Sequence, residues 1–108
     1  MRLVLDSYRC SSTFPKSETY GLVAQVRRAA VSIPANIAEG HGREHLGDYL
    51  HHLSIANGSL MELETHLLIS LKLRYLAKEE AHGILSRAAE VGRMLAGLSR
   101  ALQRRRGR

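Results

Sequence analysis

The chain is poor in the residues that build cross-linked or aromatic-rich domains. It has one cysteine, Cys10, no tryptophan, one phenylalanine and four tyrosines among 108 residues. A single cysteine excludes an intrachain disulfide and a zinc site made of cysteine ligands. Because aromatic side chains are so few, the core must consist mainly of Leu, Ala, Ile and Val, a composition that suits packed helices.

The sequence also lacks a long hydrophobic run. No stretch approaches the roughly 18–20 apolar residues of a membrane span. The N-terminal segment contains the acidic Asp6 and only a short apolar run, so it does not resemble a signal peptide. The length fits one domain. We therefore expect a soluble, cytoplasmic protein with no membrane partner.

The common catalytic and nucleotide-binding motifs are absent. There is no G-x-S-x-G, P-loop or G-x-G-x-x-G sequence, and Gly40-His41-Gly42 follows a predicted helix instead of preceding one. Nothing next to Cys10 would lower its pKa or orient a histidine base, so we expect a small packing residue and not a nucleophile. We predict that the protein is not an enzyme and uses no cofactor or small-molecule substrate.

Six histidines raise the question of a metal site. His45, Asp48 and His52 recur at helical spacing, and two imidazoles with a carboxylate could bind a divalent ion. The alternative is that all three are solvated. A di-iron bundle needs two Glu-x-x-His pairs, and only Glu79 and His82 form one. We predict no metal.

Apolar residues recur at helical spacing along almost the whole chain. The pattern predicts helices over residues 2–12, 18–39, 44–73 and 78–103. The residues expected to form the core seams are Leu3, Tyr8 and Cys10; Leu22, Val26, Ala29, Ile33 and Ile37; Tyr49, Leu53, Ala56, Leu60, Leu63 and Leu67; and Ala81, Ile84, Ala88, Val91, Leu95, Leu98 and Leu102. The third seam is expected to be widened by Leu46, Leu50, Met61 and Leu68. Short loops and heptad-like seams predict an all-α, antiparallel up-down-up-down four-helix bundle.

Several residues carry local expectations about the helix ends and packing. Ser17 is a plausible N-cap for the second helix, and Gly40 suits a left-handed cap at its end. Pro34 lies inside that helix and is expected to kink it without breaking it. Gly58 could allow a close approach to another helix.

The second predicted helix has almost no polar surface. Its core seam is opposed by a second apolar face made of small residues, Ala24, Val31, Ala35 and Ala38. A narrow polar stripe beside it contains Gln25, Arg28, Ser32, Asn36 and Glu39. A helix that is apolar nearly all round is usually buried nearly all round. We therefore expect a second contact with another copy of the chain, although small alanines also tolerate solvent.

A resemblance to a known family rests on this helix. The sequence RRAAVSIPANIAEG (27–40), with Phe14-Pro15 and Tyr20-Gly21-Leu22 ahead of it, resembles the bacterial four-helix-bundle family. That family includes proteins encoded in intervening sequences of 23S ribosomal RNA genes and accessory proteins of diversity-generating retroelements. The similarity continues through SLMELETHLLIS (59–70), so it covers nearly the whole chain.

The resemblance implies a ring-forming homo-oligomer, most plausibly a pentamer. The interface residues that we predict on the second helix are Ala24, Arg28, Val31, Ser32, Ala35, Asn36, Ala38 and Glu39. We expect Arg28 and Glu39 to pair across this interface, with direct ligand binding by Asn36 and Glu39 as the alternative.

Two positions and the start of the first helix depart from the family pattern. Arg74 stands where a glycine usually ends the third helix, and Ala77 where a serine usually caps the fourth. The first helix begins several turns late, which suggests either a truncated helix or a misassigned start.

The positive charge is concentrated at one end. Residues 1–83 contain nine Lys and Arg and nine Asp and Glu, whereas residues 84–108 contain seven arginines and only Glu90, which accounts for the net charge of +6. The predicted nucleic-acid-binding residues are Arg93, Arg100, Arg104, Arg105, Arg106 and Arg108. The first three recur at i, i+7 and i+11 and so share one helix face, which could bind phosphates without reading sequence.

Two functions follow from these patterns. The first is a non-catalytic adaptor that binds nucleic acid, RNA in particular, and acts as a cyclic homo-oligomer. Arg27, Arg28 and Arg43 could extend its basic surface. The second is a protein–protein interaction scaffold whose arginines serve solubility. We predict a single bundle domain over residues 1–103 and a basic, disordered tail over 104–108.

Overall fold

The computed structural model describes residues 1–106. The helices are α1 (Arg2–Ser11), α2 (Leu22–His41), α3 (Leu46–Lys72) and α4 (Lys78–Arg106), with a 3-10 turn, η1 (Lys16–Glu18), before α2. The described residues contain no strand. The predicted all-α class with four helices is therefore confirmed.

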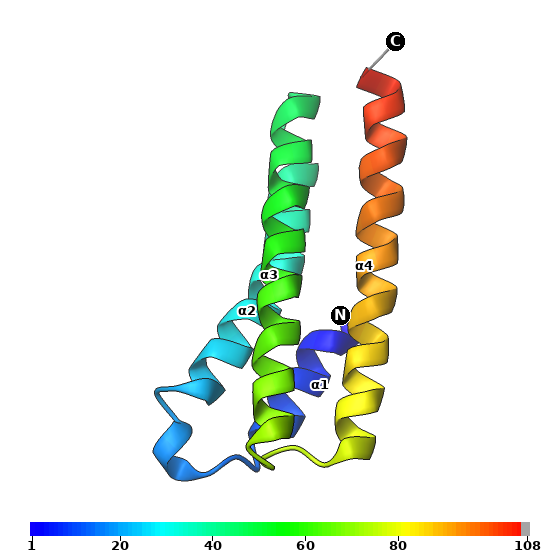
Figure 1. Ribbon diagram of the computed structural model, residues 1–108. Coiled ribbons are helices and arrows are strands. Elements are labelled where there is room, and N and C mark those ends of the chain that lie inside the picture. The colour runs from blue at the N-terminus through cyan, green and yellow to red at the C-terminus, as the bar shows by residue number, and fades with distance from the viewer. Residues whose placement is uncertain (107–108) are drawn as a thin grey trace.

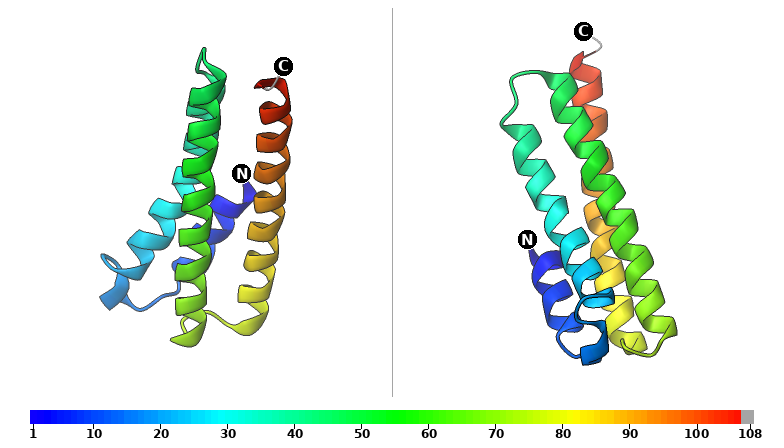
Figure 2. Two further views of the ribbon diagram at one scale, coloured as in Figure 1. Left: turned by 45° about the horizontal axis from the view of Figure 1, so that its top comes forward. Right: turned by 90° about the vertical axis from the view of Figure 1, so that its left-hand side faces the viewer.

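The three longer helices form an elongated body, and α1 is short (Figure 1). The most extensive packing is between α2 and α3, and α3 also packs against α4. The short α1 contacts both α2 and α4 and lies beside only the lower part of the body as Figure 2 shows it. Within residues 1–106, the backbones of α2 and α4 do not approach each other closely. These two helices therefore occupy diagonal corners.

The core consists of aliphatic seams, as the spacing predicts. The fully or almost fully buried residues include Val26 and Ile33 of α2, Leu53 and Leu63 of α3, and Ala88 of α4. The expected core seams of α3 and α4 are buried from Leu53 to Leu67 and from Ala81 to Leu102, with Leu98 half-buried. The small alanines let the helices approach closely while still burying apolar surface.

Three expected core residues lie on the surface instead. Tyr8 is 41% exposed, Met61 60% and Leu68 46%. In α1 the buried position next to Tyr8 is Ser7, whose hydroxyl donates to the carbonyl oxygen of Leu3 at 2.8 Å. Because a serine can satisfy its hydroxyl within its own helix, it can be buried without a partner elsewhere.

The start of α2 is fixed by Glu18 and not by Ser17. The backbone N–H of Leu22 donates to Glu18 Oε1 at 3.2 Å, and the Tyr75 hydroxyl donates to Glu18 Oε2 at 3.1 Å. The hydrogen bond to the Glu18 carboxylate raises the pKa of Tyr75. Glu18 thus joins the first turn of α2 to the α3–α4 turn.

Helix α3 ends in a left-handed residue that is not glycine. Arg74 has φ 64°, and the N–H of Tyr75 donates to the carbonyl of Ser70 at 2.9 Å. The N–H of Arg74 donates to the carbonyl of Leu71 at 3.0 Å. These two bonds are those of a Schellman motif, in which glycine is the usual residue at this position because it has no Cβ penalty.

Gly40 is a packing residue and not the expected left-handed cap. Helix α2 continues to His41, and no glycine in residues 1–106 has positive φ. A Cβ on the buried Gly40 would lie 2.8 Å from the Cβ of His52 and 3.0 Å from Tyr49 Cδ1. The close approach expected at Gly58 is absent, since a Cβ there would meet nothing within 4 Å. Pro34 lies inside α2, whose helical assignment is unbroken.

Replacing Gly40 with alanine should destabilise the protein. The added methyl group would collide with His52, so α2 and α3 must separate. Overpacking of this kind typically costs about 1–3 kcal/mol in the free energy of unfolding, which urea denaturation measures.

Gly58→Ala provides the matched control. The same methyl group enters open space in the interior of α3, so this variant should gain about 1 kcal/mol. Equal effects of the two substitutions would contradict the close α2–α3 contact.

Candidate nucleic-acid interface

Three arginines of α4 share its outward face. Arg93, Arg100 and Arg104 are all exposed, and by helical position they lie opposite the buried Val91 and Leu95. At 1.5 Å rise per residue, the first two are separated by about 10 Å along the helix and the last two by about 6 Å. The expected basic edge is therefore present on the surface.

The arginines at the C-terminal end belong to the helix. Helix α4 extends through Arg106, three residues past the end expected at Gln103, so residues 104–106 are helical and not a disordered tail. Positive side chains in the last turn complement the negative end of the helix dipole. The Arg106 guanidinium lies against the start of α3, 3.5 Å from a Cβ placed on Gly47. Arg108 lies outside the described residues.

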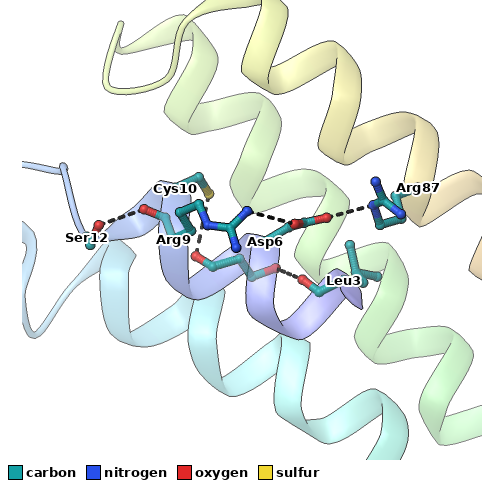
Figure 3. A network of polar contacts seen from close by, with 7 residues as sticks. Leu3, Asp6, Arg9, Cys10, Ser12 and Arg87 are labelled. Atoms are coloured by element: carbon teal, nitrogen blue, oxygen red, sulfur yellow. Dashed lines mark hydrogen bonds and ion pairs between the residues drawn. The ribbon is translucent and has the colours of Figure 1, made fainter. Parts of the chain in front are cut away.

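Several other arginines are engaged within the chain. Arg87 Nε lies 2.7 Å from Asp6 Oδ2 and joins α4 to α1 (Figure 3). Arg27 Nε donates to the hydroxyl of Ser11 at 3.0 Å, and its guanidinium carbon lies 4.7 Å from the centre of the Tyr8 ring. These contacts explain why Tyr8 lies at the surface, since the ring covers an arginine there.

The expected extension of the basic surface therefore needs correction. Arg27 is held by α1. Arg43 forms an ion pair with Glu39 at 2.7 Å, within the same protomer. Arg28 is exposed, but it belongs to the outward face of α2. The basic edge of α4 thus stands as the main cationic feature of the described residues.

Cys10 lies in a cleft of about 300 Å³ between α1 and α4. The cleft is also lined by Asp6, Arg87 and Glu80, and Figure 3 shows the ion pair between Asp6 and Arg87. Burial, followed by the negative charges of Glu80 and Asp6, raises the pKa of the Cys10 thiol to about 11. The thiol is therefore neutral near pH 7, which fits the packing role expected from the sequence.

The outward face of α2 matches its expected small-residue pattern. The exposed residues of this face are Arg28, Val31, Ala35 and Ala38, and Val31 is 42% exposed. Ala24 is half-buried. They lie opposite the buried Val26, Ala29 and Ile33.

The remaining expected interface residues have partners in their own chain. The Ser32 and Ser59 hydroxyl oxygens are 2.8 Å apart, and Asn36 Oδ1 lies 3.1 Å from His52 Nδ1. Asn36 also donates to the carbonyl of Ser32 at 2.9 Å, and Glu39 pairs with Arg43. Ser32 and Asn36 thus form a polar layer between α2 and α3, which the helical wheel alone could not distinguish from an outward stripe.

The histidines are not gathered into a metal site. Within residues 1–106, no three His, Cys, Asp or Glu side chains come together in a way that could hold an ion. His52, one of the three spaced candidates, is engaged by Asn36. No helix among these residues combines the length and hydropathy that crossing a membrane requires.

One known family matches the sequence over most of its length. The family described as 23S rRNA-intervening sequence protein matches residues 1–97, nearly the whole chain. The chain belongs to this family. The resemblance seen in the α2 sequence is therefore confirmed.

One solved structure of the same kind supports the fold. It is a protein of unknown function from the S23 ribosomal protein family of Bacteroides thetaiotaomicron. The two structures agree with a TM-score of 0.78 and 22% identity over 89% of this chain and 87% of the other. At this identity the likeness shows the fold alone. No curated protein matches the sequence.

The raised pKa of Cys10 predicts a specific loss of stability at alkaline pH. The thiol ionises at its ordinary 9.0 in the unfolded chain but only near 11 in the folded one, so its contribution is present below pH 9 and is lost as pH rises. We expect a loss of about 1–2 kcal/mol by pH 11, allowing for solvent screening.

The measurement is urea unfolding of the wild type and Cys10→Ala across this pH range. The variant removes the titrating group, so the difference between the two curves isolates the thiol. A difference that does not change with pH would contradict the assignment.

Proposed function

We propose that this protein is a non-catalytic RNA-binding adaptor that acts as a closed homo-oligomer. In this proposal the chain is an antiparallel up-down-up-down bundle with α2 kinked at Pro34. The outward face of α2 joins the subunits in a cyclic ring, most plausibly a pentamer, and the basic edge of α4 binds RNA phosphates. The location that goes with this role is the cytoplasm.

The observation that carries the proposal is the unpaired basic edge. Arg93, Arg100 and Arg104 are exposed, and within residues 1–106 none of them forms an ion pair with a carboxylate. Arg87, another arginine of α4, forms an ion pair with Asp6 of α1 instead. Exposed arginines at helical spacing can each neutralise a phosphate and release its counterions.

The diagonal placement of α2 and α4 supports both parts of the proposal. Helices α1 and α3 separate α2 from α4, so the outward faces of α2 and α4 point away from each other. In the proposed ring the α2 face of one subunit meets a surface of the next subunit other than the outward face of α4, so the arginine edge of every subunit stays open to solvent. Repetition of a weak phosphate-binding edge around a ring increases the total affinity through multivalency.

RNA is favoured over DNA as the partner because of the family description. The name refers to an intervening sequence of 23S rRNA, so the related proteins are associated with an RNA context. The edge has no aromatic residue on which an unpaired base could stack, which favours contacts to the backbone of structured RNA.

A protein-interaction scaffold is the second candidate. It is favoured by apolar side chains on the surface of α3, including Ile55 at 39%, Ile69 at 41% and Leu73 at 50% exposed. Exposed apolar patches often mark binding sites for other proteins. In this case binding to the partner protein would survive nuclease treatment and high salt.

Substitution of the basic edge tests RNA binding. The triple variant Arg93→Gln, Arg100→Gln and Arg104→Gln should weaken binding to a structured RNA. It should also lower the slope of log affinity against log salt by about 2–3, because each lost phosphate contact reduces the slope by a little under one. Fluorescence anisotropy across a salt series measures both quantities.

A second triple variant, Arg2→Gln, Lys16→Gln and Lys72→Gln, removes the same charge from exposed positions elsewhere. It should leave the slope nearly unchanged. Equal losses in the two variants would show that net charge, and not the α4 edge, drives binding.

A charge on the outward face of α2 tests self-association. Ala35→Glu places a carboxylate at the centre of the exposed stripe and should reduce the mass that light scattering measures to that of a monomer. Ala89→Glu makes the same change on the exposed face of α4 and should leave the mass unaltered. A monomeric wild type would contradict the ring.

A further inference from the structure

A groove beside the basic edge runs between α3 and α4. It has a volume of about 270 Å³. The residues that line it are Leu50, Leu53, Ser54 and Asn57 from α3 and Leu95, Ala96, Ser99 and Gln103 from α4. Near its two ends, residues of α3 and α4 lie close together. A Cβ on Gly92 would lie 3.3 Å from Leu60, and the Arg106 guanidinium lies against Gly47.

The lining of this α3–α4 groove has two chemical parts. Leu53 and Leu95 are almost fully buried beneath the groove, and the more accessible Leu50 and Ala96 provide its apolar surface. The rim carries uncharged hydrogen-bonding groups, which come from Ser54, Asn57, Ser99 and Gln103. No charged or titratable side chain is among the lining residues of the groove. The groove therefore suits a neutral group that has an apolar face and a polar edge.

The rim groups are largely available to a ligand. Within residues 1–106, no hydrogen bond to another residue is made by the hydroxyl of Ser54, the hydroxyl of Ser99 or the amide of Gln103. In contrast, Ser32 and Ser59 in the polar layer between α2 and α3 bind each other. The Asn57 amide has only a weak contact, 3.9 Å from the Met61 sulfur. These four side chains can thus donate and accept without losing an internal partner.

The groove is adjacent to the phosphate-binding edge. Arg100 lies four residues after Ala96 and three before Gln103, so it shares their side of α4. Arg93 stands three residues before Ala96. A neutral ring with a nearby anionic group is the chemistry of a nucleotide, with the base in the groove and its phosphate at the edge.

We propose that the α3–α4 groove holds one unpaired base of the bound RNA. The inference rests on the proposed RNA-binding function and adds base recognition to it. Leu50 and Ala96 contact the face of the base, and the amides of Asn57 and Gln103 bind its edge. Amide side chains can make paired hydrogen bonds to a base edge, which gives a base preference that phosphate contacts cannot provide.

The test uses four RNA hairpins that share one stem and carry loops of five A, C, G or U residues. Anisotropy with the full chain gives the affinity for each loop across a salt series. The wild type should prefer one loop over the weakest by about tenfold, in line with a bidentate amide contact. The double variant Asn57→Ala and Gln103→Ala should reduce this preference to less than about twofold, with the salt slope unchanged, because the phosphate contacts remain.

Gln25→Ala on α2 is the matched control, since it removes the same amide from an exposed position of another helix. It should keep the full preference. Asn57 and Gln103 are both exposed, so the double variant should retain its helix content, which circular dichroism checks.

The possible failures can be told apart. Salt-dependent binding that is equal for the four loops overturns the groove inference and leaves the adaptor function standing. A preference that survives the double variant also overturns it. Absence of salt-dependent binding to any hairpin overturns both the groove inference and the proposed function.

Discussion

The close approach of α2 and α3 is the constraint on which the rest of the structure depends. At Gly40 the two backbones are too near for a Cβ, and a polar layer of Ser32, Ser59, Asn36 and His52 fixes their register. Hydrogen bonds within an otherwise aliphatic interface are costly to misalign, because a shift of one turn would leave them unpaired. Once this pair is set, α3 presents its other side to α4, and α1 packs against both α2 and α4.

This arrangement separates two surfaces with different chemistry. The small-residue face of α2 and the arginine edge of α4 lie at diagonal corners, so contact at one does not cover the other. Ion pairs within the chain neutralise two arginines that lie away from the α4 edge. Arg87 and Arg43 are neutralised by Asp6 and Glu39, whereas the outward arginines of α4 form no ion pair within residues 1–106 and gather on one helix face. The separation of these two surfaces is therefore a property of the fold as well as of the distribution of charge.

The spacing of apolar residues was enough to predict the four helices and most of the core. It also placed Arg93, Arg100 and Arg104 on one exposed face, because residues at i, i+7 and i+11 coincide on any helix. The predictions for Tyr8, Met61 and Leu68 were wrong because an apolar residue at the margin of a seam is buried only if a neighbouring helix reaches it. The expected roles of Ser17 and Gly40 were wrong for a related reason. The N–H of Leu22 is bound by the carboxylate of Glu18, four residues earlier. Gly40 packs against His52, twelve residues later.

The sequence by itself determined the all-helical class, the family, the concentration of charge at the C-terminal end and the two apolar faces of α2. These features depend on periodicity, composition and local motifs, which short segments carry independently. Only the tertiary structure decided that Asn36 and Ser32 face α3, that Arg27 and Arg87 are held by α1, and that Asn57 and Gln103 line one groove. Each of these facts depends on the rotation and register of one helix against another. That geometry is set by the packing of the whole core, and no single helix encodes it.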